Sequence, residues 1–385
     1  MTTDLPVFDW AWPRYDTGSL GDVLPGVLDR LAEEPDGAVA DRLGLPHMDR
    51  AVVVLLDGLG GRLLGRRSGH APFLRSLLPS MRTLSAGFPT TTATSMGSFG
   101  TGLPPGAHGL VGYEVRIPGT GRILNELSWE DGPEPERWQP HATVFEQAVA
   151  RGLATTRIGP GFFDGSGLTR AALRGGAFVA AEDLPARVDA AVTCAATPRS
   201  LTYLYWGEVD KVGHVHGCES WQWGEELGAV DAELDRLAHS LPAGTGLVIT
   251  ADHGMVDVPT ENVVDAALDP LLTQGVDRVA GEPRSPQVYA LPGAAGDVLG
   301  RWRDRLGDRG QVLSREEAVA AGLFGRVEEN VLPRIGDVVV LMTTGHSVVD
   351  SRVHRPELIA LRGVHGSLTV DEVEVPLLTL TVTSR

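Results

Sequence analysis

Cysteine is nearly absent from this chain: only Cys194 and Cys218 occur among its 385 residues. Two cysteines are too few for a disulfide framework, and neither has the spacing of a metal-binding cysteine pair. We therefore expect two free thiols in a reducing compartment, and the cytoplasm is the predicted location. The chain also lacks a basic, apolar leader and any uncharged apolar run of about 18 residues, so neither a signal peptide nor a membrane span is expected.

Basic residues are also scarce. The 33 lysines and arginines face 50 aspartates and glutamates, which gives a formal net charge of −17. This balance argues against a general nucleic-acid-binding surface, and no nucleic-acid polymer is expected as a partner. An acidic protein can still bind a phosphate ester where bound cations offset its carboxylates locally. The overall composition is that of a soluble globular protein, and it gives no indication of an oligomeric state.

A complete nucleotide-binding glycine loop is missing as well. The turn Gly58–Leu63 follows an apolar run but lacks the third glycine of GxGxxG, and no GK[ST] follows it. The broken pattern argues against an oxidoreductase with a Rossmann-type dinucleotide site.

Strand-like and helix-like segments alternate along most of the chain. Amphipathic segments such as 142–151 and 227–240 lie between short, continuous apolar runs, which are typical of strands buried on both faces of a parallel sheet. The apolar runs are Ala51–Asp57, Leu201–Trp206, Leu247–Ala251 and Asp337–Met342. The alternation predicts an α/β fold around a mostly parallel sheet.

The same pass along the chain predicts its domain organisation. We divide it into an N-terminal extension, a core in two segments and a smaller α+β insertion or cap: residues 1–45, residues 46–258 with 337–385, and residues 260–336. A helix over roughly 19–34 is expected to pack on the core. The stretch 112–140, rich in Gly, Pro and Trp, is expected to lie near the site.

Acidic and histidine side chains follow three of the apolar runs. Asp57 ends the first run, Asp210 comes a few residues after the second, and Asp252 and His253 close the third. In open α/β sheets, ligands bind at the carboxyl ends of the strands, so these side chains are expected to meet at one edge. For Asp57 the alternative is a cap of the following helix.

Two further histidines complete a candidate ligand set. His214 lies four residues after Asp210, a spacing that places both side chains on one face of a helical turn. His365 lies between glycines on a constrained loop. Carboxylates and imidazoles in these numbers suit two metal ions, whereas His216 is interpreted as a surface histidine.

Three consecutive threonines, Thr90, Thr91 and Thr92, precede a run of small residues suited to a closely packed helix. A hydroxyl at a helix N-terminus faces unpaired N–H groups and the positive end of the dipole, which favour an alkoxide and bind a phosphoryl oxygen. An ordinary N-cap is the alternative. The residues alone leave that alternative open, together with the choice among the three threonines.

Taken together, these segments resemble the alkaline phosphatase superfamily, and most closely its type I phosphodiesterase/nucleotide pyrophosphatase family. The resemblance covers about residues 50–258 and 337–385. The family pattern P-T-x-T, then T-G, then P-x-x-H-G matches this chain, as do its A-D-H-G-M and G-x-H-G elements. The matching segments are Pro89–Thr92, Thr101–Gly102, Pro105–Gly109, Ala251–Met255 and Gly363–Gly366.

The resemblance implies an alkaline-phosphatase-like three-layer sandwich and a two-metal phosphoric ester hydrolase. Its register selects Thr92 as the nucleophile, with a phosphothreonine intermediate. It implies one metal ion on Asp57, Thr92, Asp252 and His253, and a second on Asp210, His214 and His365. Zinc is the expected ion at both sites, because few nitrogen and carboxylate ligands suit Zn²⁺ better than Mg²⁺.

The expected substrate is a small-molecule phosphate ester, and the expected activity is that of a phosphodiesterase or nucleotide pyrophosphatase. Family members that act on nucleotides carry an Asn where this chain has Tyr113, so Tyr113 is predicted to contact substrate with one hydroxyl. The alternatives are a phosphomonoesterase, phosphonate hydrolase or sulfate-ester hydrolase of the same superfamily. A more remote one is a non-catalytic binding protein on this scaffold.

Overall fold

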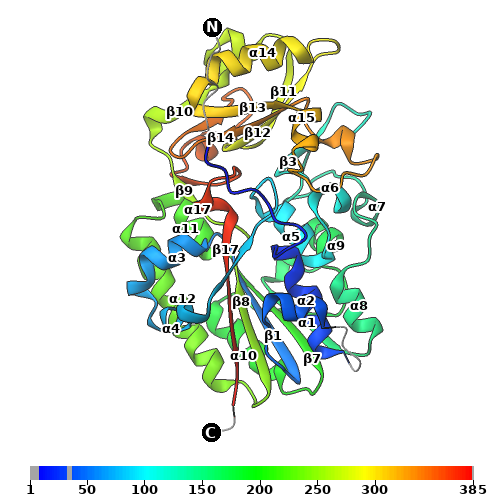
Figure 1. Ribbon diagram of the computed structural model, residues 1–385, viewed down its shortest axis with the longest axis vertical. Coiled ribbons are helices and arrows are strands. Elements are labelled where there is room, and N and C mark those ends of the chain that lie inside the picture. Colours follow the sequence, from blue (N-terminus) through cyan, green and yellow to red (C-terminus); the bar gives the residue numbers. More distant parts are fainter. Residues whose placement is uncertain (1–7, 33–36, 384–385) are drawn as a thin grey trace.

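The computed structural model describes residues 8–32 and 37–383, and they form an α/β fold around one large sheet (Figure 1). The seven strands of this sheet follow one another in the order β2 (Arg82–Ser85), β17 (Glu374–Thr381), β8 (Thr245–Thr250), β1 (Arg50–Leu56), β7 (Ser200–Trp206), β5 (Ala154–Gly159) and β6 (Ala177–Ala180). Only β17 runs antiparallel to its neighbours. The expected mostly parallel α/β fold is confirmed.

Strand β1 lies at the centre of the sheet because its residues are apolar on both faces. All of its residues from Ala51 to Leu56 are buried. It pairs in parallel with β7 and with β8, and Leu56 lies opposite Trp206 while Leu55 lies opposite Thr250. Three strands therefore end at nearly the same level, and the segments that follow them meet at one edge.

Helices cover both faces of the large sheet. Alternate residues of β7 show the two sides: the Tyr203 ring packs against Phe99 and Phe145, whereas the Trp206 indole donates to Glu226. The helices on the Tyr203 side are α1 (Val23–Leu31), α5 (Thr92–Thr101), α8 (Val144–Ala150) and α9 (Gly167–Ala172). Those on the Trp206 side are α3 (Gly61–Arg67), α4 (Pro72–Leu77), α10 (Leu184–Ala195) and α12 (Trp221–Ser240). The result is the expected three-layer arrangement.

A second, antiparallel sheet forms the upper part of the molecule in Figure 1. Its strands follow one another in the order β11 (Val276–Glu282), β12 (Ser285–Ala290), β14 (Val338–Met342) and β13 (Gly310–Ser314). The helices α13 (Pro270–Thr273), α14 (Ala295–Leu306) and α15 (Arg315–Ala320) belong to the same part of the chain.

The expectation that Asp337–Met342 forms a strand of the large parallel sheet is wrong. Strand β14 pairs antiparallel with β12 and β13. Its continuous apolar run has a different cause, because Val339 and Leu341 belong to one hydrophobic cluster while Val338, Val340 and Met342 belong to another. A strand buried on both faces has this pattern in either kind of sheet. The remaining limits of the predicted domains stay predictions.

Three two-stranded pairs and several short helices complete the described part of the chain. The pairs are β3 (Glu114–Arg116) with β4 (Ile123–Asn125), β10 (Val263–Asp265) with β15 (Ser347–Val349), and β9 (Val256–Asp257) with β16 (Gly363–Val364). The helices are α2 (Ala38–Leu43), α6 (Pro105–His108), α7 (Pro135–Trp138), α11 (Glu208–His216), α16 (Pro356–Ile359) and α17 (Val370–Val373). No helix in residues 8–32 or 37–383 is long and apolar enough to cross a membrane.

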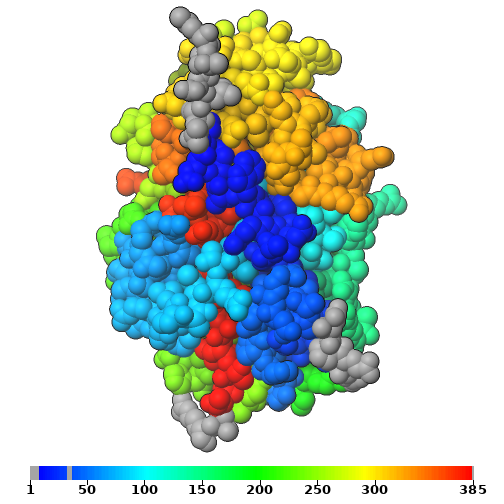
Figure 2. All heavy atoms as spheres, in the orientation of Figure 1, coloured from blue at the N-terminus to red at the C-terminus, as the bar shows by residue number. Residues whose placement is uncertain are grey.

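The N-terminal segment lies across the junction of the two sheets, as the dark blue atoms in Figure 2 show. Trp10 donates to Gln311 of β13, and the Ala11 amide donates to the Leu368 carbonyl. The helix expected over 19–34 begins as a 3-10 turn and continues as α1, which ends at Leu31; residues 33 and 34 lie outside the described residues. The segment therefore joins both parts of the molecule.

A buried ion pair also connects the two sheets. Arg284, between β11 and β12, donates to both carboxylate oxygens of Glu372 in α17, at 2.9 and 2.8 Å. Both side chains are fully buried. The remaining guanidinium hydrogens are donated to backbone carbonyls, and Glu372 also accepts from Ser367 and Thr369. Such a pair is costly to break, because the remaining charge is buried without a partner.

Replacing Arg284 with Met should therefore lower the free energy of unfolding by about 3–5 kcal/mol, because Glu372 is left charged and unpaired. The exposed pair between Arg62 and Glu374 provides the control, and Arg62→Ala should cost less than about 1 kcal/mol. Chemical denaturation of both variants measures the two effects. Equal losses would contradict the structural importance of the buried pair.

Candidate active site

The site begins where β1 ends. Asp57 follows Leu56, its amide donates to the Trp206 carbonyl at 2.9 Å, and the residue is 3% exposed. The next residue, Gly58, has a φ of 72°, and a Cβ there would lie 2.9 Å from Asp210. Glycine is therefore required after Asp57, both for the left-handed conformation and for the close approach of Asp210.

Asp252 and His253 follow the neighbouring strand β8, and both are fully buried. One oxygen of Asp252 accepts hydrogen bonds from the Gly58 amide at 3.0 Å and the His253 amide at 2.9 Å. Its other oxygen, Oδ2, is buried without a hydrogen-bond partner. The backbone thus orients this carboxylate so that one oxygen stays available to a ligand.

Asp210 and His214 lie one turn apart on α11, as their spacing predicts. His214 Nε2 lies 3.1 Å from Asp210 Oδ2. His365, which follows β16, has its Nε2 at 3.8 Å from Asp210 Oδ1, and Oδ1 is buried without a hydrogen-bond partner. The antiparallel pairing of β16 with β9 brings this late loop beside the segment after β8.

The three imidazoles of the site share one orientation. In each ring Nδ1 lies within hydrogen-bond distance of a backbone carbonyl, which identifies it as the protonated donor. The pairs are His214 with Gly363 at 2.7 Å, His253 with Gly254 at 3.0 Å, and His365 with Thr90 at 2.7 Å. Each Nε2 is left facing the site, which is the arrangement that metal-binding histidines adopt.

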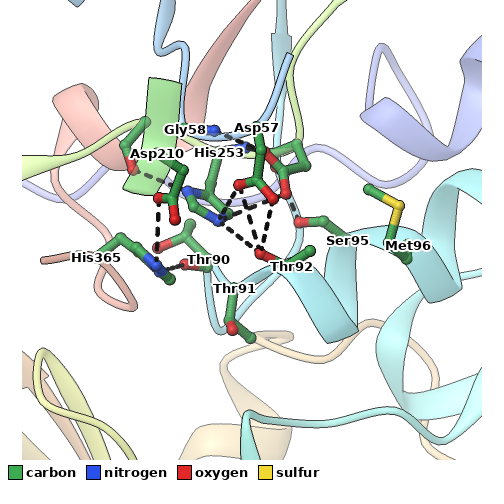
Figure 3. Close-up of polar contacts among 12 residues, drawn as sticks. Asp57, Gly58, Thr90, Thr91, Thr92, Ser95, Met96, Asp210, His253 and His365 are labelled. Atoms are coloured by element: carbon green, nitrogen blue, oxygen red, sulfur yellow. Dashed lines mark hydrogen bonds and ion pairs between the residues drawn. The ribbon is translucent and has the colours of Figure 1, made fainter. Parts of the chain in front are cut away.

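Among the three adjacent threonines, Thr92 is the one that faces these groups (Figure 3). It begins α5, and its Oγ1 lies 3.3 Å from His253 Nε2 and 3.4 Å from Asp57 Oδ2. Thr91 donates instead to Glu282, and Thr90 donates to the Ser367 carbonyl. The conformation of the loop before α5 therefore directs three chemically identical hydroxyls toward different partners.

Carboxylates are concentrated in the site, and their pKa values reflect it. Burial, reinforced by the charges of Asp252 and Asp210, raises the pKa of Asp57 well above its usual value. Burial likewise raises the pKa of Asp252 to about 7. Burial would also raise the pKa of Asp210, but the neighbouring His214 lowers it. Bound cations would relieve this crowding of negative charge.

The donor atoms fit metal ions in their chemistry and spacing. Two groups of side chains bring their ligand atoms within 4.8 Å of one another: Asp210, His214 and His365, and Asp57, Asp210 and His253. Around His253 Nε2, Thr92, Asp57 and Asp252 place oxygens at 3.3 to 3.5 Å. Ligands about 2.0–2.1 Å from a tetrahedral Zn²⁺ are themselves about 3.3–3.4 Å apart. The division of seven residues between two ions stays a prediction.

Two cavities meet at Thr92 and Asp210. The first, of about 360 Å³, is lined by Tyr113, Glu282 and His354. The second, of about 560 Å³, extends along the sheet past Tyr205. Leu127 lines both, so the stretch 112–140 contributes to each wall. The predicted substrate residue Tyr113 lies in the first cavity, where burial raises the pKa of its hydroxyl.

The sequence patterns do not identify two residues of the site. Tyr205 donates to Asp57 from inside β7, where it is one of several aromatic residues with no distinguishing neighbour. Glu282 reaches the site from β11 of the second sheet, accepting from Thr91, and burial raises its pKa to about 7. His108 lies outside the site, fully buried, with its Nε2 3.1 Å from Ser98 Oγ. His216 is exposed, as predicted.

The comparisons with known proteins agree with this geometry. A family model described as type I phosphodiesterase/nucleotide pyrophosphatase matches residues 51–368. No curated protein matches the chain.

Among solved structures, murine ectonucleotide pyrophosphatase/phosphodiesterase 5 is similar with a TM-score of 0.68 and 18% identity, over 85% of this chain and 87% of that one. An inactive variant of that enzyme, in complex with AMP, gives a TM-score of 0.67 and 17% identity, over 86% of this chain and 87% of that one. Phosphonoacetate hydrolase from Sinorhizobium meliloti 1021, in complex with phosphonoformate, gives a TM-score of 0.66 and 21% identity, over 87% of this chain and 91% of that one. These similarities confirm the expected fold.

Two histidines of α11 allow a matched test of metal binding. His214→Ala removes an imidazole that faces the site and should abolish binding of one metal ion. His216→Ala should bind as many metal ions as the wild type, because the His216 side chain is exposed. Elemental analysis after dialysis against Zn²⁺ measures the stoichiometry, with two ions expected in the wild type. Equal metal content in His214→Ala and wild type would exclude His214 as a ligand.

Proposed function

This chain belongs to the type I phosphodiesterase/nucleotide pyrophosphatase family, and from that premise we propose that it hydrolyses a phosphodiester or pyrophosphate bond in a small molecule. Thr92 is the proposed nucleophile. The proposed metal ligands are Asp57, Thr92, Asp252 and His253 for one ion, and Asp210, His214 and His365 for the other. The proposed substrate contact is Tyr113.

The observation that carries the proposal is the position of Thr92 at the meeting point of two cavities. A phosphodiester has two organic groups, which extend from two of the four oxygens on its tetrahedral phosphorus. A phosphorus atom beside the Thr92 hydroxyl can place one group in each cavity. A monoester has a single organic group and would leave one cavity to solvent, so the geometry favours a diester.

The residues of the site support an in-line displacement. The Thr92 oxygen forms a bond to phosphorus while the bond to the leaving oxygen breaks, and water then hydrolyses the resulting phosphothreonine. The first amides of α5 lack partners within the helix and are available to phosphoryl oxygens beside Thr92. Tyr205 orients Asp57 beside Thr92. Two bound Zn²⁺ ions would favour the deprotonated threonine and offset the charge on the phosphoryl and leaving oxygens.

The ligands of two similar structures support this chemistry. The murine enzyme solved with AMP is an inactive threonine-to-alanine variant. The bacterial hydrolase binds phosphonoacetate and phosphonoformate, which are small anions with a tetrahedral phosphorus. We propose that this chain likewise binds a small molecule that contains phosphorus, and that a threonine is essential to its activity. Its cytoplasmic location stays a prediction from its two cysteines, which are both free.

Substrate preference tests the diester assignment. The zinc-loaded protein should hydrolyse bis(4-nitrophenyl) phosphate with a kcat/KM at least about 10-fold above that for 4-nitrophenyl phosphate, since the diester alone fills both cavities. Release of 4-nitrophenolate measures both rates. A preference for the monoester would replace the proposal with a phosphomonoesterase.

Substituting the adjacent threonines tests the nucleophile. Thr92→Ala should lower kcat by at least about 10³-fold, while the ion on Asp210, His214 and His365 is retained, because the adjacent Thr90 and Thr91 donate their hydroxyls elsewhere. Thr92→Ser should keep substantial activity. Thr91→Ala provides the matched control, since its hydroxyl is directed toward Glu282, and it should lose about 10-fold at most. Activity of Thr92→Ala near the wild-type level, in metal-loaded protein, would exclude Thr92.

A further inference from the structure

The second cavity is built on three neighbouring strands. Arg157 of β5 lies opposite Phe178 of β6 and Tyr203 of β7, so these three side chains stand side by side on one face of the sheet. All three line the cavity, and Thr92 lines the same cavity. The arginine is therefore part of the wall that faces an organic group attached to phosphorus at Thr92.

Arg157 is 8% exposed, and its Nε and Nη1 are buried without hydrogen-bond partners. The other buried arginines in the described residues behave differently. Arg187 donates to three backbone carbonyls, Arg334 donates to two although its Nε is unpartnered, and Arg284 pairs with Glu372. A buried guanidinium without acceptors is costly, because its donors have lost water and gained nothing in return.

The residues around Arg157 offer it no acceptor within the protein. Its guanidinium lies 5.6 Å from the centre of the Phe178 ring. Asp164 contributes only a longer-range charge, and burial is the main influence on Arg157, lowering its pKa. Because Arg157 lines the cavity, a molecule bound there can supply an acceptor to these two nitrogens.

The cavity also indicates the shape of that molecule. Phe163 packs against Tyr205 with ring centres 5.5 Å apart, and both line the cavity with Phe178. Aromatic walls of this kind suit a flat, apolar group. A volume of about 560 Å³ is within the range of small-molecule sites. The planar guanidinium fork matches the two oxygens of a carboxylate or the oxygens of a phosphate.

We propose that Arg157 determines the specificity of the second cavity by binding an anionic oxygen group, a carboxylate or a phosphate, at the far end of the substrate's organic group. The flat, apolar part of that group lies between the anion and the phosphorus, against Phe163 and Phe178. This inference rests on the proposed function, and it narrows the substrate to an ester that carries a second negative charge.

Three synthetic diesters test the inference: 4-nitrophenyl phenyl phosphate and its analogues with a carboxylate or a phosphonate at the para position of the phenyl ring. In the wild type, at least one charged analogue should have a kcat/KM about 10- to 100-fold above the uncharged diester, the range of one charge-assisted pair. The preferred analogue separates carboxylate from phosphate recognition. In Arg157→Met the preference should fall to about 1, because kcat/KM should fall more for the charged analogue than for the uncharged diester.

Two further variants control for charge and for folding. Arg116→Met removes the same charge from a residue that lines neither cavity, and it should keep the wild-type preference. Arg157→Lys keeps the charge without the fork and should show an intermediate preference. It also replaces Arg157→Met if that variant does not fold.

Binding of the products gives a readout that does not depend on turnover. Calorimetry should show that 4-carboxyphenyl phosphate or 4-phosphonophenyl phosphate binds the wild type more tightly than phenyl phosphate, and that the difference is lost in the Arg157 variants. Equal affinities in the wild type, or a preference that survives in Arg157→Met, would overturn the inference. Failure of the metal-loaded wild type to hydrolyse any diester would overturn the proposed function instead, and the binding series would still decide the role of Arg157.

Discussion

The parallel pairing of β1 with β7 and β8 is the constraint on which the rest of the site depends. Because Leu56 lies opposite Trp206 and Leu55 opposite Thr250, the segments after all three strands begin at the same edge. Asp57 and Asp252 follow two of these strands directly, and α11 carries Asp210 after the third. A shift of one strand by two residues would move its ligand by about 6–7 Å, which is too far for a common site.

Three carboxylates, those of Asp57, Asp210 and Asp252, lie close together at this edge, and burial raises the pKa of Asp57 and of Asp252. Backbone groups stabilise and orient these side chains. The Gly58 and His253 amides donate to Asp252, and backbone carbonyls orient all three imidazoles. Oxygens of Asp210 and Asp252 still lack partners. The fold thus holds the proposed metal ligands in an arrangement that bound cations would stabilise.

The second sheet adds a wall of the first cavity to this edge. Its position relative to the large sheet depends on the buried pair of Arg284 and Glu372, and on the N-terminal segment that crosses the junction (Figure 2). In this position the second sheet places Glu282 in the wall of the first cavity. The second cavity is different, because its arginine and aromatic residues come from the large sheet and the loops after its strands. The second sheet therefore contributes to the wall of the first cavity, whereas the wall of the second cavity belongs to the large sheet and its loops.

Local patterns in the sequence were enough to predict the α/β fold and the residues that meet after the strands, since strand burial and the Asp-x3-His spacing depend on near neighbours. They could not assign β14 to a sheet, because a strand buried on both faces reads the same in either one. They could not identify Glu282, Tyr205 or Arg157 as site residues, because nothing beside them in the chain distinguishes them. The family resemblance selects Thr92 among the three threonines, but only the tertiary structure shows that it faces Asp57, which lies 35 residues away. Only the tertiary structure shows that Arg157 has two buried nitrogens without partners, because its neighbours belong to other strands of the sheet.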